Sequence, residues 1–500
     1  METTELIDLQ LELAELRKRK AIDCINNFYV LFTTFWSCLS GDTYVHNWHI
    51  EYLCNVLQSV GMRLIKREVG IADLLINIPP GMTKSSIVSA FVVWVWLQAP
   101  NFRFIGSSYS SGLAIDNSLR AKNIIKSDLF QKLFQPYFIK LFGKYFELTK
   151  DNENDWRNNF GGGYYATSTG GTVQGKHAHC ILRDDPINPE QAESKAYRDK
   201  CNRYNDRTLA GRKVDKDRTV TITIMQRLHE EDTTGHELKK KGKNITHICL
   251  PGQLTADVLP PELAAKYVNG LLDPVRLSYI TLEKMKIDFG SYGYAGQILQ
   301  TPIKAGGNMI KTDWFGRFSL SQLMAEVENK HGTLAWHFTI DGAYTAEKGN
   351  DATALLCYAI WNNNMYIRDV AVIRMEMPEL LNFIPEFVVR NGYNRNLSKI
   401  YIEPKANGLS VAQMIKRNTS LNIVIDDPPK TDKIARVAMC LPYMESLRVY
   451  LLESANFIDK FLDEVKVFPL ADHDDQVDTL TMAIIRVTTS STGSRQRWIG

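Results

Sequence analysis

Residues 75–86 read LINIPPGMTKSS, an apolar run that ends at two prolines and is followed by a lysine and two serines. A buried strand, a tight loop and a helix that begins with Lys and Ser or Thr form the phosphate-binding loop of many nucleotide hydrolases. The usual spacing G-x-x-x-x-G-K-[ST] is not met, because its two glycine positions hold Ile78 and Thr83, and the loop's one glycine is Gly81. Taken alone, the stretch supports a nucleotide site and an ordinary strand-to-helix turn about equally.

In the nucleotide interpretation each residue type has a role. Lys84 can bring a point charge to the β- and γ-phosphates, and the Ser85 hydroxyl can hold Mg²⁺. Backbone N–H groups at the start of the helix would surround the phosphate oxygens. The predicted ATP-binding residues are Pro80, Gly81, Met82, Thr83, Lys84, Ser85 and Ser86.

A second segment, HCILRDDP (179–186), places two carboxylates at the end of an apolar strand. A Walker B strand ends in this way, with one acid in the Mg²⁺ shell and the next orienting the attacking water. We assign Asp184 to magnesium and Asp185 to water activation, although the order is open because the second position more often holds Glu. The plain alternative, two solvated acids before a proline turn, loses weight about a hundred residues after a phosphate-loop candidate.

A third segment, TITIMQRLHEEDTTG (221–235), is a β-branched strand that runs into a charged loop. Gln226, Arg227 and His229 at its tip are candidate coupling or sensor residues for a γ-phosphate or DNA. A solvated strand end explains the same residues about equally well.

Carboxylates of a different kind follow in the second half of the chain. Asp341 in FTIDGAY and Glu403 in KIYIEPKANG lie on apolar strands, where a carboxylate is costly unless it is paired or bound to a metal. HDDQVDTL then opens a helix with Asp474, Asp475 and Asp478. Acids in a first helical turn also suit the helix dipole, but that reading leaves the two strand carboxylates unexplained.

Acids from two strands and a helix are what a two-metal phosphodiesterase needs, because paired Mg²⁺ or Mn²⁺ ions take carboxylate oxygens. We predict Asp341, Glu403 and Asp475 as catalytic, with Asp474 and Asp478 as further metal ligands. Which of the three helix acids complete the site stays open. Asp351 and Asp369 are interpreted as structural.

Length and composition bound the remaining possibilities. Five hundred residues favour two domains. The net charge of +3 is too balanced for a strongly basic nucleic-acid binder, so DNA contacts must come from local patches. Eight scattered cysteines without a C-x-x-C pair argue against a zinc site or a disulfide framework. The longest apolar stretch, IVSAFVVWVWLQAP, is too short to span a bilayer, and a cytoplasmic location is expected.

The alternation of apolar strands with helices predicts an α/β protein with a parallel sheet covered on both faces, followed by a second α/β unit. The expected segments are a helical N-terminal segment at 1–44, a nucleotide-binding domain at 45–250, a lid and linker at 251–330, a nuclease domain at 331–487 and a flexible tail at 488–500.

These motifs, in this order, resemble the large terminase subunit of tailed bacteriophages. The resemblance covers about residues 45–487 and includes INIPPGMTKSS, GSSYSSGLA, TGGTVQGKHAHCILRDDPI, IMQRLHEEDTTG, FGSYGYAGQILQTPIKAGGNMI, TIDGAY, YIEPKANG and HDDQVDTL. It implies a P-loop ATPase domain of the ASCE type and a C-terminal RNase H-like nuclease domain. Members often carry a degenerate Walker A with Arg and Gly where this chain has Gly81 and Thr83.

The resemblance further implies a motor in which ATP hydrolysis moves double-stranded DNA into a procapsid and a Mg²⁺- or Mn²⁺-dependent endonuclease cuts concatemeric DNA. The implied partners are DNA, a portal protein, a small terminase subunit and further copies in a ring, expected to be a pentamer. The implied location is the host cytoplasm, with transient docking on the procapsid. Arg120, Arg157 and Arg227 are candidates for an arginine that acts in trans, and ELKKKGKN (237–244) is the best local basic patch.

Three other functions remain open at this point. An RNase H-like recombinase or repair nuclease would not need DNA translocation. A helicase-type ATPase with an inactive second domain would hydrolyse ATP without cutting DNA. A structural capsid-vertex protein with decayed sites would do neither.

Overall fold

The computed structural model describes residues 2–240, 244–303, 309–342, 352–375, 377–404, 408–427, 429, 431–469 and 474–495. The chain separates into two compact units, one of Met1–Lys284 with Gly293–Ile303 and one of Met285–Tyr292 with Lys304–Gly500. The division falls inside the 251–330 segment that the sequence predicts as a lid and linker.

The first unit is built on an eight-stranded sheet in the order β3-β4-β5-β2-β6-β7-β1-β8. The six strands from β5 to β8 in this order run parallel, and β3 and β4 add an antiparallel edge. The strands are β1 (Asp73–Asn77), β2 (Arg103–Ser108), β3 (Leu148–Asp151), β4 (Asp155–Asn158), β5 (Gly163–Ser168), β6 (Cys180–Asp184), β7 (Val220–Met225) and β8 (Ile245–Cys249).

Strand β7 lies between β1, which leads into the phosphate-loop candidate, and β6, which ends at the carboxylate pair. All residues of β1, β6 and β7 are buried, as expected for parallel strands that are covered on both faces. The parallel sheet predicted for the first unit is therefore confirmed.

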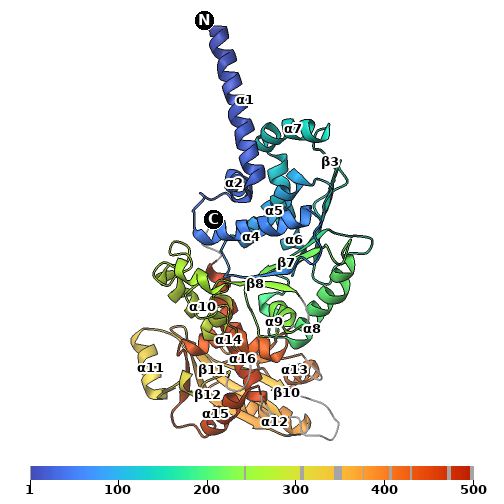
Figure 1. The fold of residues 1–500 in the computed structure, drawn as a ribbon. Helices are drawn as coiled ribbons and strands as arrows, with labels where there is room; N and C mark the ends of the chain where they lie inside the picture. Colours follow the sequence, from blue (N-terminus) through green and yellow to red (C-terminus); the bar gives the residue numbers. More distant parts are fainter. Residues whose placement is uncertain are drawn as a thin grey trace. The chain divides into compact units, whose positions relative to one another are not determined.

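Helices cover both faces of this sheet. In Figure 1, α5 and α6 lie on one side of the strands and α8 and α9 on the other. Helix α5 buries twelve of its fifteen residues, so the apolar run at 87–97 is an interior helix, as its sequence predicts. The helices are α1 (Glu2–Asn26), α2 (Phe28–Thr34), α3 (Trp36–Leu39), α4 (Trp48–Ile65), α5 (Lys84–Gln98), α6 (Ser111–Lys126), α7 (Asp128–Phe142), α8 (Lys195–Arg203) and α9 (Thr233–Lys239), with 3-10 turns η1 (Pro189–Gln191), η3 (Ala210–Arg212) and η4 (Pro261–Lys266) and a π-helical segment η2 (Tyr204–Leu209).

The second unit is built on a seven-stranded sheet in the order β14-β13-β10-β11-β12-β15-β9. Strands β10, β11 and β12 form an antiparallel meander, and β13 and β14 continue the sheet parallel to β10. The strands are β9 (Phe315–Phe318), β10 (Trp336–Gly342), β11 (Thr353–Trp361), β12 (Asn364–Ile373), β13 (Ile400–Ile402), β14 (Ile423–Ile425) and β15 (Val449–Leu452).

Two separate cores lie on the two faces of this sheet. On β11, Leu355 and Cys357 pack against α12 and α13, whereas Leu356 and Tyr358 pack against α14, α15 and α16. The unit is thus a three-layer α/β/α arrangement, and the second α/β unit predicted from the sequence is confirmed. Its helices are α11 (Leu320–Asn329), α12 (Met377–Arg390), α13 (Gly408–Asn418), α14 (Lys433–Glu445), α15 (Ile458–Val467) and α16 (Asp475–Arg495), with the 3-10 turn η5 (Thr312–Trp314).

Two further features complete the description. Helix α10 (Tyr279–Gln297) is broken at Gly290, whose φ is +65°. Helix α16 continues to Arg495, into the 488–500 segment that the sequence predicts as a tail. In the described part of the chain, every helix is too short or too polar to cross a membrane.

Candidate active sites

The phosphate-loop candidate connects β1 to α5 in the first unit. The chain leaves the sheet after Asn77 and enters α5 at Lys84. On the way it takes positive φ values at Gly81 (+79°) and at Thr83 (+66°). Thr83 holds the position where the usual motif has glycine, and its backbone adopts the left-handed conformation that glycine favours. The left-handed turn before Lys84 is therefore present without the glycine.

Lys84 points from the start of α5 to the ends of two other strands. Its side chain is buried, and its Nζ lies 2.7 Å from the carboxylate of Asp185, just after β6. The same Nζ donates to Oε1 of Gln226, just after β7. The structure thus brings together residues from the three segments that the sequence singles out in this half.

Asp184 is the buried member of the carboxylate pair. Its Oδ2 accepts a hydrogen bond from Asn117 of α6 at 2.7 Å, and its Oδ1 has no hydrogen-bond partner in the described part of the chain. Burial, and then the charge of Asp185, raise the pKa of Asp184 to about 6, although Lys84 and Ser85 act in the opposite direction. A buried carboxylate oxygen without a donor, close to the Ser85 hydroxyl, fits the ligand chemistry of Mg²⁺.

A cavity of about 450 Å³ lies next to this loop. Gly81, Thr83, Lys84 and Ser85 line one side of it, and the stretch from Trp36 to Val45 lines another. The N-terminal segment that the sequence treats separately is therefore part of this pocket's wall. Arg120 of α6 lines the same cavity and donates to Asn117 Oδ1 at 2.7 Å.

The other candidate arginines are placed differently. The Arg227 Nε donates to the fully buried Asp232 carboxylate at 2.9 and 3.1 Å, and its guanidinium also contacts the His229 carbonyl. His229 is buried as well, and burial lowers its pKa to about 4. Arg157 is half-exposed. Of the three predicted coupling residues, Gln226 reaches Lys84, whereas Arg227 and His229 form an internal network.

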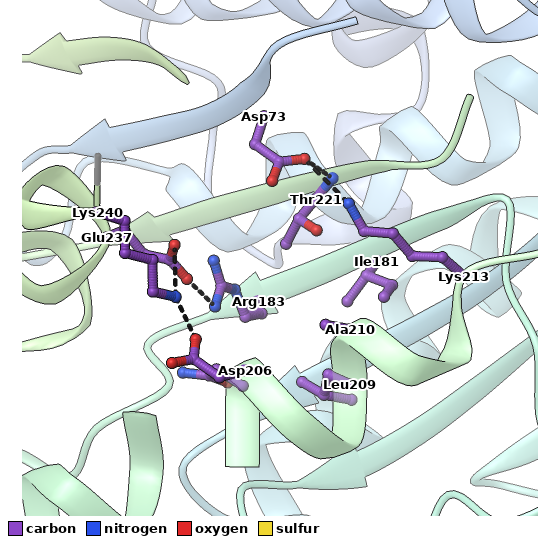
Figure 2. Close-up of a pocket in the computed structure, with 11 residues that line it drawn as sticks. Asp73, Ile181, Arg183, Asp206, Leu209, Ala210, Lys213, Thr221, Glu237 and Lys240 are labelled. Carbon is purple, nitrogen blue, oxygen red and sulfur yellow. Dashed lines mark hydrogen bonds and ion pairs between the residues drawn. The ribbon is translucent and has the colours of Figure 1, made fainter. Parts of the chain in front are cut away.

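A second cavity, of about 220 Å³, is lined by Ile181 and Arg183 of β6 (Figure 2). Arg183, which precedes Asp184, pairs with Glu237 of α9 at 3.0 Å, and both side chains are buried. Lys240 lies 3.2 Å from Glu237 and also pairs with Asp206. These ion pairs tie α9 to the strand that carries the carboxylate pair. Lys240 is engaged internally, and 241–243 of the predicted basic patch lie outside the described residues.

The second candidate site lies at the carboxyl end of β10. Asp341 near the end of β10 and Glu403 just after β13 share a hydrogen bond, and Asp478 of α16 is close enough to act on Asp341 through its charge. Burial, and then the charges of Asp478 and Glu403, raise the pKa of Asp341 to about 7. Mutual repulsion of this kind is what a divalent cation would relieve.

Basic side chains face these acids from α14. The Lys433 Nζ lies 2.5 Å from Asp474 and 2.6 Å from Asp478, and Arg436 lies 3.0 Å from Asp478. Burial lowers the pKa of Lys433, but Asp478 and Asp474 more than offset this and the net shift is upward. Neither Lys433 nor Arg436 is singled out by the sequence, because nothing in their local spacing points to the acids.

Asp475 is placed apart from this group. It lines a different cavity and acts through its charge on Glu464 of α15. The structure therefore brings Asp341, Glu403 and Asp478 together, links Asp474 to Asp478 through Lys433, and leaves Asp475 on another side of the first turn of α16.

The donor set suits a hard divalent cation, which prefers carboxylate oxygens. Within the described ranges, no group of three or more His, Cys, Asp or Glu side chains is close enough to hold a metal as it stands. The neighbouring segments 343–351, 405–407 and 470–473 lie outside the described residues.

A comparison with protein families finds a match for most of the second unit. Residues 338–486 match the family described as the terminase RNaseH-like domain. A comparison of the sequence with curated proteins gives no match.

Several solved structures resemble the chain. The large terminase of a thermophilic bacteriophage matches with a TM-score of 0.46 and 11% identity, over 86% of this chain and 98% of that one. The HK97 bacteriophage large terminase matches with a TM-score of 0.36 and 12% identity, over 92% and 99%. The human cytomegalovirus terminase nuclease domain matches with a TM-score of 0.26 and 12% identity, over 33% and 88%. The family match identifies residues 338–486 as a terminase RNase H-like domain, as the predicted resemblance to the large terminase subunit implies for this part of the chain.

Proposed function

We propose that this chain is the large subunit of a viral DNA-packaging motor, with ATP hydrolysis in the first unit and DNA cleavage in the second. One observation carries the proposal. A single chain combines a phosphate-loop lysine held against a strand-end carboxylate pair with a terminase RNase H-like domain in which three acids meet at one end of the sheet.

In the first unit, the chain supplies three functions around a bound nucleotide. The loop's backbone N–H groups and Lys84 would bind the phosphates, and Ser85 and Asp184 would hold Mg²⁺, whose charge would neutralise developing charge on the phosphates. Asp185 orients the attacking water. Because Lys84 is hydrogen-bonded to both Asp185 and Gln226, one ammonium group connects the phosphate loop with the residues that orient water and couple hydrolysis to movement.

In the second unit, Asp341, Glu403 and Asp478 are the proposed metal ligands, with Asp474 next to them. Divalent cations bound there would stabilise the attacking and leaving oxygens of the phosphodiester. Lys433 and Arg436 balance the negative charge of the helix acids and fix their orientation. The metal is Mg²⁺ or Mn²⁺.

The same proposal implies a set of partners. The chain would bind double-stranded DNA, dock on a portal protein as a ring of copies, and receive its DNA from a small terminase subunit in the host cytoplasm. The large terminase of the thermophilic bacteriophage has been solved with ATP-γ-S, and the cytomegalovirus nuclease domain after soaking with Mn. For this chain, we propose nucleotide and divalent-metal binding from the residues of its own two candidate sites.

Plasmid cleavage by the full-length protein tests the nuclease directly. Wild type in Mg²⁺ or Mn²⁺ should cut supercoiled plasmid, and Asp341→Ala should not. Asp313→Ala, which removes an exposed carboxylate of the same unit, is the matched control and should cut like wild type. Equal cutting by Asp341→Ala would place the activity elsewhere and overturn the site.

A further inference from the structure

A cavity of about 910 Å³ opens in the second unit beside the second half of β12. Strand β15 pairs with β12 only at Met365, Tyr366 and Ile367. From Arg368 onward this edge of β12 has no strand beside it in the described part of the chain. The chain between β15 and α15, the first two turns of α15, the start of α16 and the end of α12 bound the remaining sides. We call this space the β12 groove.

Basic side chains gather in the β12 groove. It is lined by Arg368, Arg374, Arg390 and Lys460. Arg390 pairs with Asp369 at 3.2 Å. Within the described ranges, the other three basic groups make no ion pair, and the side chains of Arg374 and Lys460 are exposed.

The carboxylates of the groove are already engaged. Asp369 accepts from Asn391 Nδ2 at 2.8 Å as well as pairing with Arg390, and Asp463 pairs with Lys466. Glu464 accepts from the backbone N–H of Gln476 at 2.7 Å, and burial raises its pKa. The fourth acid, Asp475, is not free either. In the described part of the chain, three of the four basic side chains therefore make no ion pair with the carboxylates that line the groove.

The backbone of β12 directs one of these cations into the groove. Tyr358 of β11 is opposite Ile367 and Cys357 is opposite Asp369, so Arg368 is the extra residue of a β-bulge. A bulge turns its side chain away from the regular alternation of the strand. The Arg368 guanidinium lies 5.2 Å from the centre of the Trp336 ring, which holds it in place without neutralising its charge.

The β12 groove lies at the same end of the sheet as the proposed nuclease acids. Asp341 is in register with Ala354, and Ala354 with Val372, which lines the groove. Two strand spacings separate Asp341 from Val372 by about 10 Å. The first turn of α16 contributes to both places, with Asp478 near Asp341 and Asp475 in the groove.

We propose that the β12 groove binds the sugar-phosphate backbone of DNA beside the cleavage site, with Arg374 and Lys460 contacting phosphates and Arg368 supporting them. This rests on the proposed nuclease function. Unpaired cations on exposed side chains suit contacts that position DNA without reading its sequence. The groove would hold the strand while the acids about 10 Å away cut it.

DNA binding by the full-length protein tests the groove without chemistry. Binding of a short fluorescent duplex is measured by anisotropy in EDTA between 50 and 200 mM salt. Arg374→Ala combined with Lys460→Ala should weaken binding about tenfold and lower the slope of log K against log salt by about 1.8, the value for two lost phosphate contacts. The matched control is Lys416→Ala with Arg417→Ala on α13, which removes the same charges from exposed positions outside the groove and should leave the slope unchanged.

Each outcome decides the matter. An unchanged salt slope in the groove variant would overturn the proposal, and it is the result expected if an acidic protein segment fills the groove instead of DNA. An equal loss of DNA binding in the control variant would overturn it too. Plasmid cleavage in Mn²⁺ separates DNA binding by the groove from catalysis by the acids. The groove variant should have a higher KM for DNA than wild type and an unchanged kcat. If wild type does not cut but the slope still changes, the groove stands and the nuclease assignment fails.

Discussion

At the scale of single residues, Thr83 has an unusual backbone conformation in the proposed phosphate loop. A β-branched residue with φ of +66° is rarely tolerated, because its Cβ crowds the following carbonyl. Such strain persists where the surrounding structure requires it and is common at functional sites. Thr83 precedes Lys84, so its conformation sets the direction in which the lysine leaves the loop.

Replacing Thr83 with glycine should therefore stabilise the protein. We expect Thr83→Gly to raise the free energy of unfolding of the first unit by about 1 kcal/mol, the left-handed strain less the extra entropy of glycine in the unfolded chain. Chemical denaturation with urea measures it. Thr83→Ala is the control, because alanine at the same φ keeps the strain. A glycine variant no more stable than the alanine variant would show that the loop is not strained.

The sequence predicts part of each site at this scale. Lys84, Ser85, Asp184 and Asp185 follow from the ends of apolar strands, where spacing and chemistry agree. Asn117, which holds Asp184, could not be predicted, because it lies in the middle of α6 among other polar residues. Its role depends on how α6 packs on the sheet, which no local pattern records.

At the scale of elements, the orientation of helix α16 decides which acids can belong to the proposed nuclease site. The sequence places Asp475 and Asp478 on one helical face because they are three residues apart. In the structure Lys433 joins Asp474 and Asp478 instead, and Asp475 turns toward Glu464. The rotation of a helix about its axis depends on tertiary packing, here against β10 and β11, so the sequence could name the acids but not choose among them.

Cleavage by two matched variants of α16 checks this choice. Asp478→Asn should lower the cleavage rate by at least about 100-fold, as expected when a metal ligand rather than its support is lost. Asp475→Asn, an identical change one turn earlier, should cut at nearly the wild-type rate. The plasmid assay in Mn²⁺ measures both. A larger loss in Asp475→Asn would restore the assignment predicted from the sequence.

At the scale of the whole molecule, we expect the two units to differ in how they respond to acid. The first unit holds four histidines whose pKa burial lowers to about 4: His49, His179, His229 and His247. In the described part of the second unit, burial lowers the pKa of one histidine, His337, to about 4. Each unit also has one acid of a proposed site with a raised pKa, Asp184 in the first and Asp341 in the second, so the effects of these two acids largely cancel in the comparison.

The sign of the histidine effect follows from proton binding. With a folded pKa of about 4 and an ordinary value of 6.5, the unfolded chain binds more protons between these two values. The stabilisation is complete above pH 6.5 and is lost as the pH falls toward 4. The first unit should therefore lose protection before the second between pH 7 and pH 5. Hydrogen exchange followed by mass spectrometry, corrected for intrinsic rates, measures this in the intact protein. Earlier opening of the second unit would contradict it.

We propose above all that one chain carries two independent hydrolytic sites. The most direct test measures ATP hydrolysis and plasmid cleavage side by side for wild type, Lys84→Ala and Asp341→Ala. We predict that Lys84→Ala loses ATP hydrolysis and keeps cleavage, and that Asp341→Ala loses cleavage and keeps ATP hydrolysis. Loss of both activities in either variant, or of neither, would contradict the assignment of the two sites.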